Sequence, residues 1–345
     1  MDLGGVQRSL INLLNAIDYK HYDIDLYLVH DKNFFNKSIP DNVTIHTVKP
    51  LPTIAKILPF IAARQLFRSR FLSYDKEYDV AIDYSGYQHV TAIGALEVQA
   101  TKRIMWFHGN HRARLKTDWR YQVLWLLQKA KYAGFDRAAV VSKGLVELVS
   151  EDTPFSARQI YVVNNYVDTE EIISLSQQQA EINMSPDDYW LVSVSRLAEE
   201  KGVDRSIMLH AKVLQRRSNV SLCVVGGGPD RAKLQSLVQE LGTADKVVFV
   251  GPQPNPYAYM ASADGYISIP RSEGQGISTV EAVCLGLEIF VPQELEAFTG
   301  VKVRGSSDLE SAIVNARRAP KSVNRLHDYN QDVLKAFDTL MKDKE

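Results

Sequence analysis

One stretch near the middle of the chain reads Leu191-Val-Ser-Val-Ser-Arg196-Leu-Ala-Glu-Glu-Lys201-Gly-Val-Asp204, an apolar run followed by a charged turn. The run predicts a buried strand that ends near Ser195, and the amphipathic stretch from Asp204 predicts a helix after it. A strand, a turn and a helix in this order are typical of a parallel sheet, whose strands need a crossover between them. Arg196 would then leave from the carboxyl edge of a strand, where open α/β sheets bind ligands, and Lys201 would follow in the same turn; a solvated charged loop is the alternative.

The same alternation continues on both sides of this unit. Strands are expected at 24–29, 43–48, 80–84, 103–107, 138–141, 160–163, 190–194, 220–225, 246–250, 265–269 and 288–291. Helices are expected at 5–17, 54–71, 88–99, 119–133, 144–150, 204–216, 231–241, 257–262, 279–285 and 329–341. The rhythm restarts after about residue 183, which indicates an α/β chain of two Rossmann-like domains facing across a cleft. We expect an N-terminal domain at 1–168, a linker at 169–187 and a C-terminal domain at 188–325. A final helix at 326–345 is expected to pack back toward the first domain.

Composition limits the function. The chain has 345 residues and a formal net charge of −1, with 45% hydrophobic and 23% charged residues, as in a soluble protein of two domains. The near-zero charge argues against general nucleic-acid binding. Cys223 and Cys284 lie in apolar runs, so we expect reduced, buried thiols in a cytosolic protein. No apolar run reaches the roughly 20 residues that span a bilayer, and no secretory signal is recognisable.

A second informative stretch reads Glu273-Gly-Gln-Gly-Ile-Ser-Thr-Val-Glu281. Its two carboxylates can accept hydrogen bonds from hydroxyl groups. Free backbone N–H groups of Gly276, Ile277 and Ser278, at an expected helix start, can face an anion. A sugar nucleotide has hydroxyls at both ends and phosphate in the middle, so it would fit this stretch. A capping box formed by Ser278 and Glu281 is the alternative, and it would explain Glu281 without a ligand but not Glu273.

Two further glycine turns and one histidine are candidates. Gly226-Gly-Gly228 follows an expected strand, although a tight turn explains it better than phosphate binding does. Gly5 lies in a Gly-Gly turn that leads into a helix and could seat an anion. His108 directly follows the strand at 103–107; it is either a structural hydrogen-bonding residue or a residue of the site.

Two stretches mix basic with aromatic or apolar residues, at 62–71 and 111–121. The ordinary interpretation is an amphipathic helix with a solvated face. The alternative is peripheral contact with an anionic membrane surface at the inner face of the cell membrane.

Taken in order along the chain, these motifs resemble those of the retaining nucleotide-sugar glycosyltransferases of family four, which have the GT-B fold. The resemblance rests on Arg196 to Lys201-Gly202, Gly226-Gly-Gly-Pro229, Val248-Phe-Val-Gly251, Glu273-Gly to Glu281-Ala, Gly4-Gly5-Val-Gln-Arg, Phe107-His108-Gly109, Val141-Ser142 and Asn164-Asn-Tyr-Val-Asp168. It covers nearly the whole chain, and the ordered set is more specific than any single motif.

The resemblance implies a role for each matching residue. Arg196 and Lys201 would bind the donor diphosphate, together with Gly5 and the backbone amides of Gly276, Ile277 and Ser278. Glu273 would contact the transferred hexose and His108 would lie near the reacting sugar, which makes these two the catalytic candidates. Glu281 would contact the nucleotide ribose. The family transfers hexose with retention and without a metal ion or another cofactor.

Two departures from the family pattern concern the donor side. The family has a buried strand just before the Gly-Gly turn, and none is recognisable here. The N-terminal domain is therefore expected to lack its first strand and to expose an unpaired edge, unless the start is truncated or another segment fills the gap. After Pro292 the family has a longer glycine-containing loop with its own helix, where this chain has a short Gln-Glu-Leu-Glu-Ala-Phe-Thr-Gly.

These observations favour a cytoplasmic hexosyltransferase that uses a nucleotide-sugar donor and a glycan or lipid-linked acceptor of bacterial-type surface polysaccharide. A catalytically weak GT-B partner or chaperone subunit is the alternative from another class. A nucleotide-sugar epimerase of similar fold fits the paired basic residues and paired glutamates less well.

Overall fold

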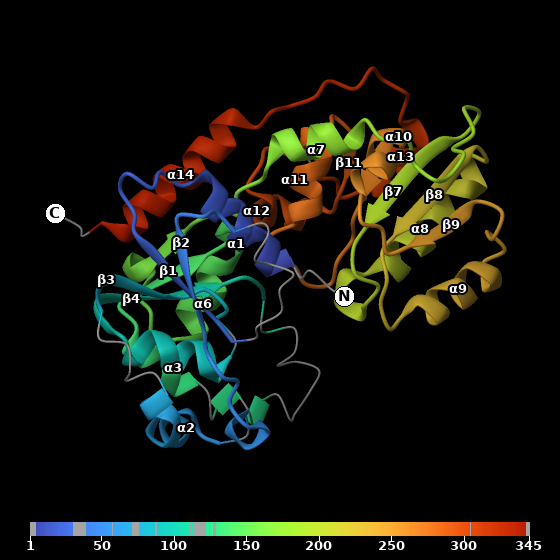
Figure 1. Cartoon of the computed structure of the whole chain (residues 1–345). Helices are drawn as coiled ribbons and strands as arrows, with labels where there is room; N and C mark the ends of the chain where they lie inside the picture. The colour runs from blue at the N-terminus through green and yellow to red at the C-terminus, as the bar shows by residue number, and fades with distance from the viewer. Residues whose placement is uncertain are drawn as a thin grey trace. The chain divides into compact units, whose positions relative to one another are not determined.

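The computed structural model describes residues 5–29, 39–56, 58–70, 76–86, 88–110, 112, 122–123, 125–126, 129–303 and 305–342 (Figure 1). Its internal contacts divide the chain into two units. Unit 1 comprises residues 1–166 and 330–345, and unit 2 comprises residues 167–329. Every strand pair in the described residues is parallel, as the alternating pattern of the sequence predicts.

Unit 2 is built on one parallel sheet. Its described strands are β7 (Tyr189–Val194), β8 (Val220–Val225), β9 (Val247–Gly251), β10 (Gly265–Ile267) and β11 (Glu288–Phe290), in the order β11-β10-β7-β8-β9. The chain runs outward from β7 to β9 and then crosses to the other side of β7. The strand order therefore reverses between β7 and β10, and open α/β sheets bind ligands at the carboxyl edge of such a point.

Helices cover both faces of this sheet, and alternate residues of each strand point to opposite faces. Leu191 and Leu222 lie in the core on one face, whereas Val192 and Cys223 lie in the core on the other. The helices of unit 2 are α7 (Thr169–Ser176), α8 (Val203–Arg216), α9 (Arg231–Glu240), α10 (Tyr257–Ser262), α11 (Ile277–Cys284), α12 (Glu296–Thr299) and α13 (Leu309–Asn315), with short 3-10 turns η6 (Glu199–Lys201) and η7 (Gln293–Leu295). Both cysteines are free and buried, which confirms that prediction.

Helix α7 corrects the expected linker at 169–187. Asp168 is its N-cap and accepts a hydrogen bond from the backbone N–H of Glu171 (3.0 Å), while Ile172 is buried in the unit 2 core. Asp followed by an amphipathic turn is an N-terminal helix signal, and the glutamine run after it concealed that signal. The segment is therefore part of unit 2 rather than a free connection.

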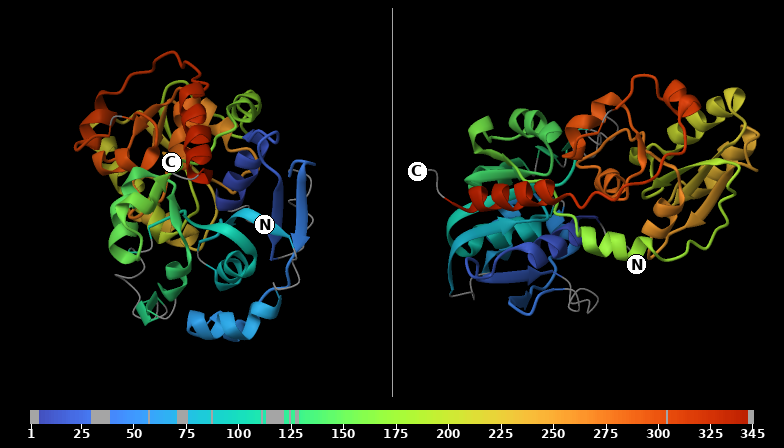
Figure 2. Two further views of the ribbon diagram at one scale, coloured as in Figure 1. Left: turned by 90° about the vertical axis from the view of Figure 1, so that its left-hand side faces the viewer. Right: turned by 90° about the horizontal axis from the view of Figure 1, so that it is seen from above.

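The described residues of unit 1 form two parallel sheets. The larger is formed by β3 (Glu77–Asp83), β4 (Gln99–Phe107), β5 (Arg137–Val140) and β6 (Ile160–Val162), in that order, and the smaller by β1 (Ile24–Leu28) and β2 (Val43–Thr47). The described helices are α1 (Gly5–Ala16), α2 (Phe60–Phe67), α3 (His89–Glu97), α6 (Val146–Asp152) and α14 (His327–Met341), with 3-10 turns η1 (Thr53–Lys56), η2 (Arg68–Arg70), η3 (Lys129–Gly134), η4 (Lys143–Leu145) and η5 (Ala157–Gln159). Figure 2 shows α14, in red, alongside the strands of unit 1, where its last turn accepts hydrogen bonds from Lys102 and Arg137.

The strands of unit 1 occur where the sequence predicts them, but the helix expected at 54–71 is broken. Pro59 precedes α2 and separates it from η1, because a proline disfavours helical geometry in the residue before it. Of the helix expected at 119–133, residues 119–121, 124, 127 and 128 lie outside the described residues, and its end forms η3.

The two sheets of unit 1 are linked by side chains rather than by a backbone ladder. In the described residues β1 pairs only with β2, and β3 pairs only with β4. The Tyr78 hydroxyl donates to Asp25 (2.6 Å) and lies 2.7 Å from the Tyr27 hydroxyl, while Lys76 bridges Asp25 and Asp23. Residues 5–16 form α1, and the first strand along the described chain is β1.

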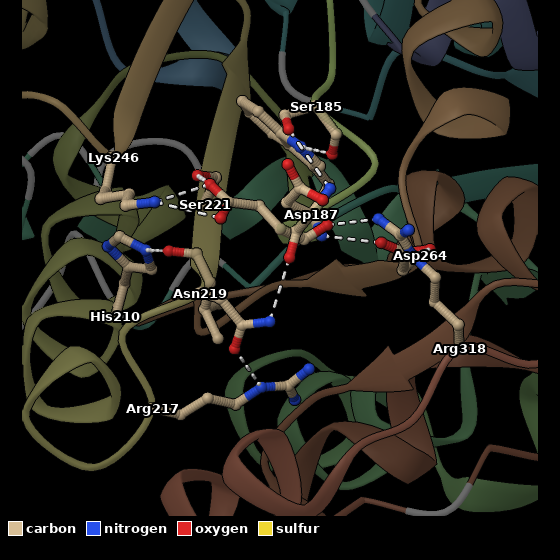
Figure 3. Close-up of polar contacts among 12 residues, drawn as sticks. Ser185, Asp187, His210, Arg217, Asn219, Ser221, Lys246, Asp264 and Arg318 are labelled. Carbon is tan, nitrogen blue, oxygen red and sulfur yellow. Dashed lines mark hydrogen bonds and ion pairs between the residues drawn. The ribbon is translucent and has the colours of Figure 1, made fainter.

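Polar side chains hold the amino ends of the unit 2 strands together (Figure 3). Asp188 accepts hydrogen bonds from Lys246 Nζ (2.8 Å) and from Ser221 Oγ (2.5 Å). Asp264 accepts one from Arg318 Nε (2.9 Å). Burial opposes ionisation of Asp188, but the hydrogen bonds from Lys246 and Ser221 hold its pKa below the ordinary value. This edge lies opposite the ligand-binding edge, so its polar groups serve stability.

We predict that Asp188→Ala lowers the free energy of unfolding of unit 2 by about 1–3 kcal/mol, because it removes the partner of two donors that are largely buried. Urea unfolding followed by circular dichroism would measure the change. The exposed neighbour Asp187, changed to Ala, is the matched control and should lie within about 0.5 kcal/mol of the wild type. Equal stabilities of the two variants would contradict a structural role for the Asp188 network.

Candidate functional site

The loop after β7 approaches its neighbours at distances that only glycine permits. A Cβ on Gly226 would lie 1.9 Å from the Ser195 carbonyl oxygen, and one on Gly202 would lie 2.1 Å from that of Ile269. Both glycines have positive φ angles, of 139° and 60°. The Gly226 turn therefore packs directly against the backbone of the loop after β7. This close packing favours the tight-turn interpretation of that motif over phosphate binding.

This loop brings Lys201 to Glu273. Lys201 Nζ lies 3.0 and 3.1 Å from the two carboxylate oxygens of Glu273, and the backbone N–H of Gly274 donates to the same carboxylate (3.1 Å). The Glu273 side chain is 12% exposed and that of Lys201 is 30% exposed. Two residues that are 72 positions apart in sequence thus form one charged pair at the point where the strand order reverses.

Arg196 lies on the same loop but is more exposed. Its guanidinium forms an ion pair with Glu200, four residues further along the chain, and 58% of its side chain is exposed. Burial opposes ionisation of Glu200, but the hydrogen bond from Arg196 holds the pKa of Glu200 below its ordinary value. Exposed pairs of this kind contribute little to stability, so Arg196 can turn to another anion at small cost.

The backbone amides at the start of α11 are less available than the sequence suggests. The Gly276 N–H donates to the Phe298 carbonyl (3.1 Å), and the Ile277 N–H donates to the Gln275 carbonyl (2.8 Å). The expectation that these two amides are free is therefore wrong in this structure. For Gly276 the cause is α12, which folds from the short segment after Pro292 and places the Phe298 carbonyl against the glycine-rich turn; the partner of Ile277 is local. Ser278 is the second residue of α11.

Glu281 is not part of a capping box. Helix α11 begins at Ile277 with Gly276 as its N-cap, so Ser278 and Glu281 do not hold the positions that a capping box needs. The Glu281 side chain instead accepts a hydrogen bond from the Tyr257 hydroxyl (2.8 Å), and the residue is 9% exposed. The capping-box alternative for Glu281 is thus removed, and Glu281 is a buried carboxylate on the helix that follows the glycine-rich turn.

Three polar residues of this region escape sequence reasoning. Tyr257 supports Glu281, the Tyr266 hydroxyl lies 2.8 Å from Ser278 Oγ, and Gln275 donates to the Thr299 carbonyl (3.1 Å). Gln275 lies between two glycines of the stretch from Glu273 to Glu281, and this position could have identified it. The two tyrosines lie in other elements, and no sequence pattern identifies them.

In unit 1, the carboxyl edge of the larger sheet gathers polar residues around His108. Its Nε2 lies 2.7 Å from the Tyr84 carbonyl, and its ring lies 4.7 Å from the Tyr84 ring, centroid to centroid. Ser9 of α1 lies 2.9 Å from the Tyr84 hydroxyl. Gly5 is the first residue of α1 and is exposed. Tyr84 follows β3 as His108 follows β4, so the same edge rule could have identified it.

His108 is neutral at physiological pH. Burial lowers the pKa of His108 to about 4, opposed by its hydrogen bond to the Tyr84 carbonyl. Because a carbonyl oxygen only accepts hydrogen bonds, the neutral ring must carry its proton on Nε2. Nδ1 is then an acceptor that can receive a hydrogen bond from a hydroxyl group.

A buried carboxyl group, of Asp83, and a buried amine, of Lys131, lie beside this edge. Asp83 accepts a hydrogen bond from the Gly86 N–H (3.1 Å), and Lys131 donates to the Gly86 carbonyl (3.0 Å). Burial raises the pKa of Asp83 and lowers the pKa of Lys131 to about 8, and each group opposes the shift of the other. Both therefore brace the turn at Gly86, which follows Tyr84 and precedes α3.

Within the described ranges, no group of three or more His, Cys, Asp or Glu side chains is placed to hold a metal ion. Nor does any helix in those ranges have the length and apolar character needed to cross a membrane.

We predict that acid destabilises the protein in part through His108. Between about pH 6.5, the ordinary value for an unfolded histidine, and pH 4, the unfolded chain binds a proton that the folded chain does not. The free energy of unfolding should therefore decrease as the pH decreases through this window, by up to about 3 kcal/mol from His108. His108→Gln should remove that part of the loss, whereas the exposed His21→Gln control should follow the wild type; denaturant unfolding at pH 7 and pH 4.5 decides this. Parallel pH curves for wild type and His108→Gln would contradict the assignment.

Two family models match the chain. The model described as Glycosyltransferase Family 4 matches residues 3–171, and the model described as Glycosyl transferases group 1 matches residues 176–293. Between them they extend over both units and include every candidate site residue.

The similarity to named proteins is distant but long. An uncharacterized glycosyltransferase of Methanocaldococcus jannaschii is 23% identical over 193 residues, which are 55% of this chain and 48% of that protein. The chain thus matches about half the length of this relative. In Campylobacter jejuni, N-acetylgalactosamine-N,N'-diacetylbacillosaminyl-diphospho-undecaprenol 4-alpha-N-acetylgalactosaminyltransferase is 24% identical over 294 residues, 81% of this chain and 75% of the relative.

A solved structure shares the fold. Anabaena HepE in complex with UDP and glucose is 17% identical, with a TM-score of 0.64 over 99% of this chain and 94% of that one. The GT-B fold that the motifs imply is therefore confirmed. With two family models on its two halves and this fold, the chain belongs to the group 1 glycosyltransferases of family 4.

Proposed function

We propose that this protein transfers a hexose from a nucleotide-sugar donor, with retention, to a glycan or lipid-linked acceptor in the synthesis of a bacterial-type surface polysaccharide. The observation that carries the proposal is the Lys201–Glu273 pair at the point where the unit 2 strand order reverses, with the buried Glu281 on the adjacent helix α11. A cation and two carboxylates at one sheet edge suit a ligand that has phosphates between two sets of hydroxyls.

The basic residues would act on the leaving group. Breaking the bond between the sugar and the diphosphate leaves negative charge on the diphosphate. Arg196 can bind phosphate oxygens through its fork, and Lys201 can add a point charge. Preorganised cations of this kind stabilise developing charge in the transition state, so the proposed reaction needs no metal ion and no other cofactor.

The carboxylates would orient the two sugar rings. Glu273 is proposed to accept hydrogen bonds from the transferred hexose, and Glu281 from the ribose of the nucleotide. Ser278, the second residue of α11, is proposed to contact the diphosphate through its backbone. Gly276 and Ile277 can join it where their present carbonyl partners give way, and Gly5 is proposed to face the phosphates from the start of α1.

His108 would contact the transferred hexose as a neutral acceptor. Its Nε2–H is held by the Tyr84 carbonyl, so Nδ1 is the atom available to a sugar hydroxyl. A neutral imidazole adds no positive charge next to an oxocarbenium-like sugar, which a charged one would oppose. The attacking hydroxyl of the acceptor is proposed to enter on the same face as the departing diphosphate.

The names of two relatives support the proposed acceptor class. The Campylobacter jejuni relative is named for transfer to a sugar carried on diphospho-undecaprenol. A Streptococcus pneumoniae relative, 28% identical over 44% of this chain and 36% of its own length, is named alpha-monoglucosyldiacylglycerol synthase. Both names describe acceptors with a lipid portion, which supports a cytoplasmic protein that works at the inner membrane surface.

The surface of α2 supports contact with such a membrane. Ile54, Ile61 and Leu66 are 57%, 61% and 65% exposed. Residues 49–70, which include α2, carry five basic and no acidic side chains. Exposed apolar groups among positive charges are typical of helices that lie in the interface of an anionic bilayer. Of the other basic stretch, at 111–121, only Arg112 is described, and it forms ion pairs with Glu151 and Asp152.

Donor binding and turnover test the proposal directly. A thermal-shift screen against UDP-, GDP-, ADP- and TDP-sugars should find one class that stabilises the protein, by roughly 2.7 kcal/mol at 100 times its dissociation constant. With that donor, Arg196→Ala should lower turnover by roughly 10²–10³-fold while leaving the urea midpoint unchanged. Lys201→Ala should show a similar loss of turnover. Lys212→Ala, an exposed lysine on α8, is the control. Wild-type turnover in the Arg196 and Lys201 variants would contradict their role.

Vesicle sedimentation tests the membrane contact. Wild-type protein should bind vesicles of phosphatidylglycerol and phosphatidylcholine more tightly than vesicles of phosphatidylcholine alone, and less tightly at high salt. The double variant Ile61→Ser/Leu66→Ser should bind at least tenfold more weakly, because it removes two exposed apolar side chains worth roughly 1.5 kcal/mol each. Met208→Ser, which changes an exposed apolar residue of unit 2, is the matched control. Unchanged binding of the double variant would place any membrane contact elsewhere.

A further inference from the structure

Tyrosine hydroxyls form hydrogen bonds with polar side chains of α11 and of the glycine-rich turn that precedes it. The Tyr257 hydroxyl donates to Glu281 (2.8 Å), and the Tyr266 hydroxyl lies 2.8 Å from Ser278 Oγ. The Gln275 amide donates to the Tyr329 hydroxyl (2.7 Å). Both Tyr257 and Tyr266 are 1% exposed and belong to the unit 2 core. These contacts come from elements distant in sequence, so the turn is positioned by the core and not by its own cap.

The Tyr257–Glu281 contact differs from the others because it involves a buried carboxylate. A buried charge is costly unless hydrogen bonds satisfy it, so a carboxylate in this position adopts the orientation that its donors dictate. Tyr257 is the first residue of α10, and its ring is fixed in the core beside α7 and α11. The phenol is therefore a rigid donor, and it limits rotation of the Glu281 side chain.

We propose that Tyr257 is a positioning residue that orients Glu281 toward the vicinal hydroxyls of the donor ribose. The proposal deepens the function proposed above and rests on it. Tyr257 touches neither the sugar nor the phosphates in this scheme; it acts through Glu281. It would make the protein selective for ribonucleoside diphosphates over analogues that lack the ribose hydroxyls, because a site built to hydrogen-bond a hydroxyl rejects a ligand without it.

The inference predicts a loss of discrimination and not a general loss of binding. Tyr257→Phe removes one oxygen and keeps the ring, so the core packing is preserved. Without the Tyr257 hydroxyl, Glu281 loses a hydrogen bond that fixes its orientation, and the wild-type preference for a ribonucleoside diphosphate over its 2′,3′-dideoxy counterpart should fall roughly tenfold. Affinity for the dideoxy compound should stay within about twofold of the wild type, because it never used Glu281.

Calorimetric titration with UDP, GDP and ADP, each paired with its 2′,3′-dideoxy form, makes this measurement on the full chain. Tyr259→Phe is the matched control, since it removes a buried phenol from the same helix, one that bonds the backbone of Glu181 and not Glu281. It should keep the wild-type preference. In a Glu281→Gln background, Tyr257→Phe should have no further effect on the preference, because its target is already altered.

The outcomes separate the two proposals. A wild-type preference for the ribose form that Tyr257→Phe loses and Tyr259→Phe keeps would support the inference. A preference that survives in Tyr257→Phe, or equal weakening of ribose and dideoxy forms, would overturn it and leave the proposed function standing. A wild-type protein that binds a TDP-sugar but none of the six compounds would overturn this inference alone. One that binds none of the six compounds and no sugar nucleotide of the thermal-shift screen would overturn the proposed function, and this inference with it.

Discussion

The close backbone approach around the loop after β7 is the constraint on which the unit 2 site depends. Two carbonyl groups, of Ser195 and Ile269, occupy the space where side chains of Gly226 and Gly202 would otherwise lie. The loop is thereby held between the turns that follow β8 and β10. Lys201 meets Glu273 only because these three turns are stacked this closely, so the charged pair depends on glycines that touch no charge themselves.

In unit 2, strand positions were predictable because the strands are short, mainly apolar runs that are buried on both faces. Leu191 and Val192 point to opposite sides of the sheet, and both sides are covered by helices, so the run is mainly apolar. Helix ends were less predictable. α7 was concealed by the polar stretch after it, and the helix at 54–71 is divided at Pro59.

The site was predictable in its charges but not in its contacts. Arg196, Lys201 and Glu273 follow strands, and the carboxyl edge of a parallel sheet brings such residues together. The partner of Glu281 could not be predicted, because Tyr257 lies 24 residues earlier and at the start of another helix. The capping box explained Glu281 by a residue three positions away, whereas its partner in the structure is Tyr257 on another helix. The occupied amide of Gly276 has the same origin, since its partner Phe298 lies in α12 further along the chain, whereas the Ile277 amide bonds locally to Gln275.

The Lys201–Glu273 pair also affects how the empty site would behave. Lys201 and Glu273 already form an ion pair, so the Glu273 carboxylate competes with a ligand phosphate for Lys201. In the proposed function a donor phosphate displaces a carboxylate from Lys201, and the released carboxylate turns to sugar hydroxyls. The number of charge contacts is the same before and after, because one partner is exchanged for another. The affinity of this site for a donor is therefore a difference between two nearly equal interaction free energies. A ligand that has phosphate but no sugar would displace Glu273 from Lys201 without supplying hydroxyl partners for Glu273.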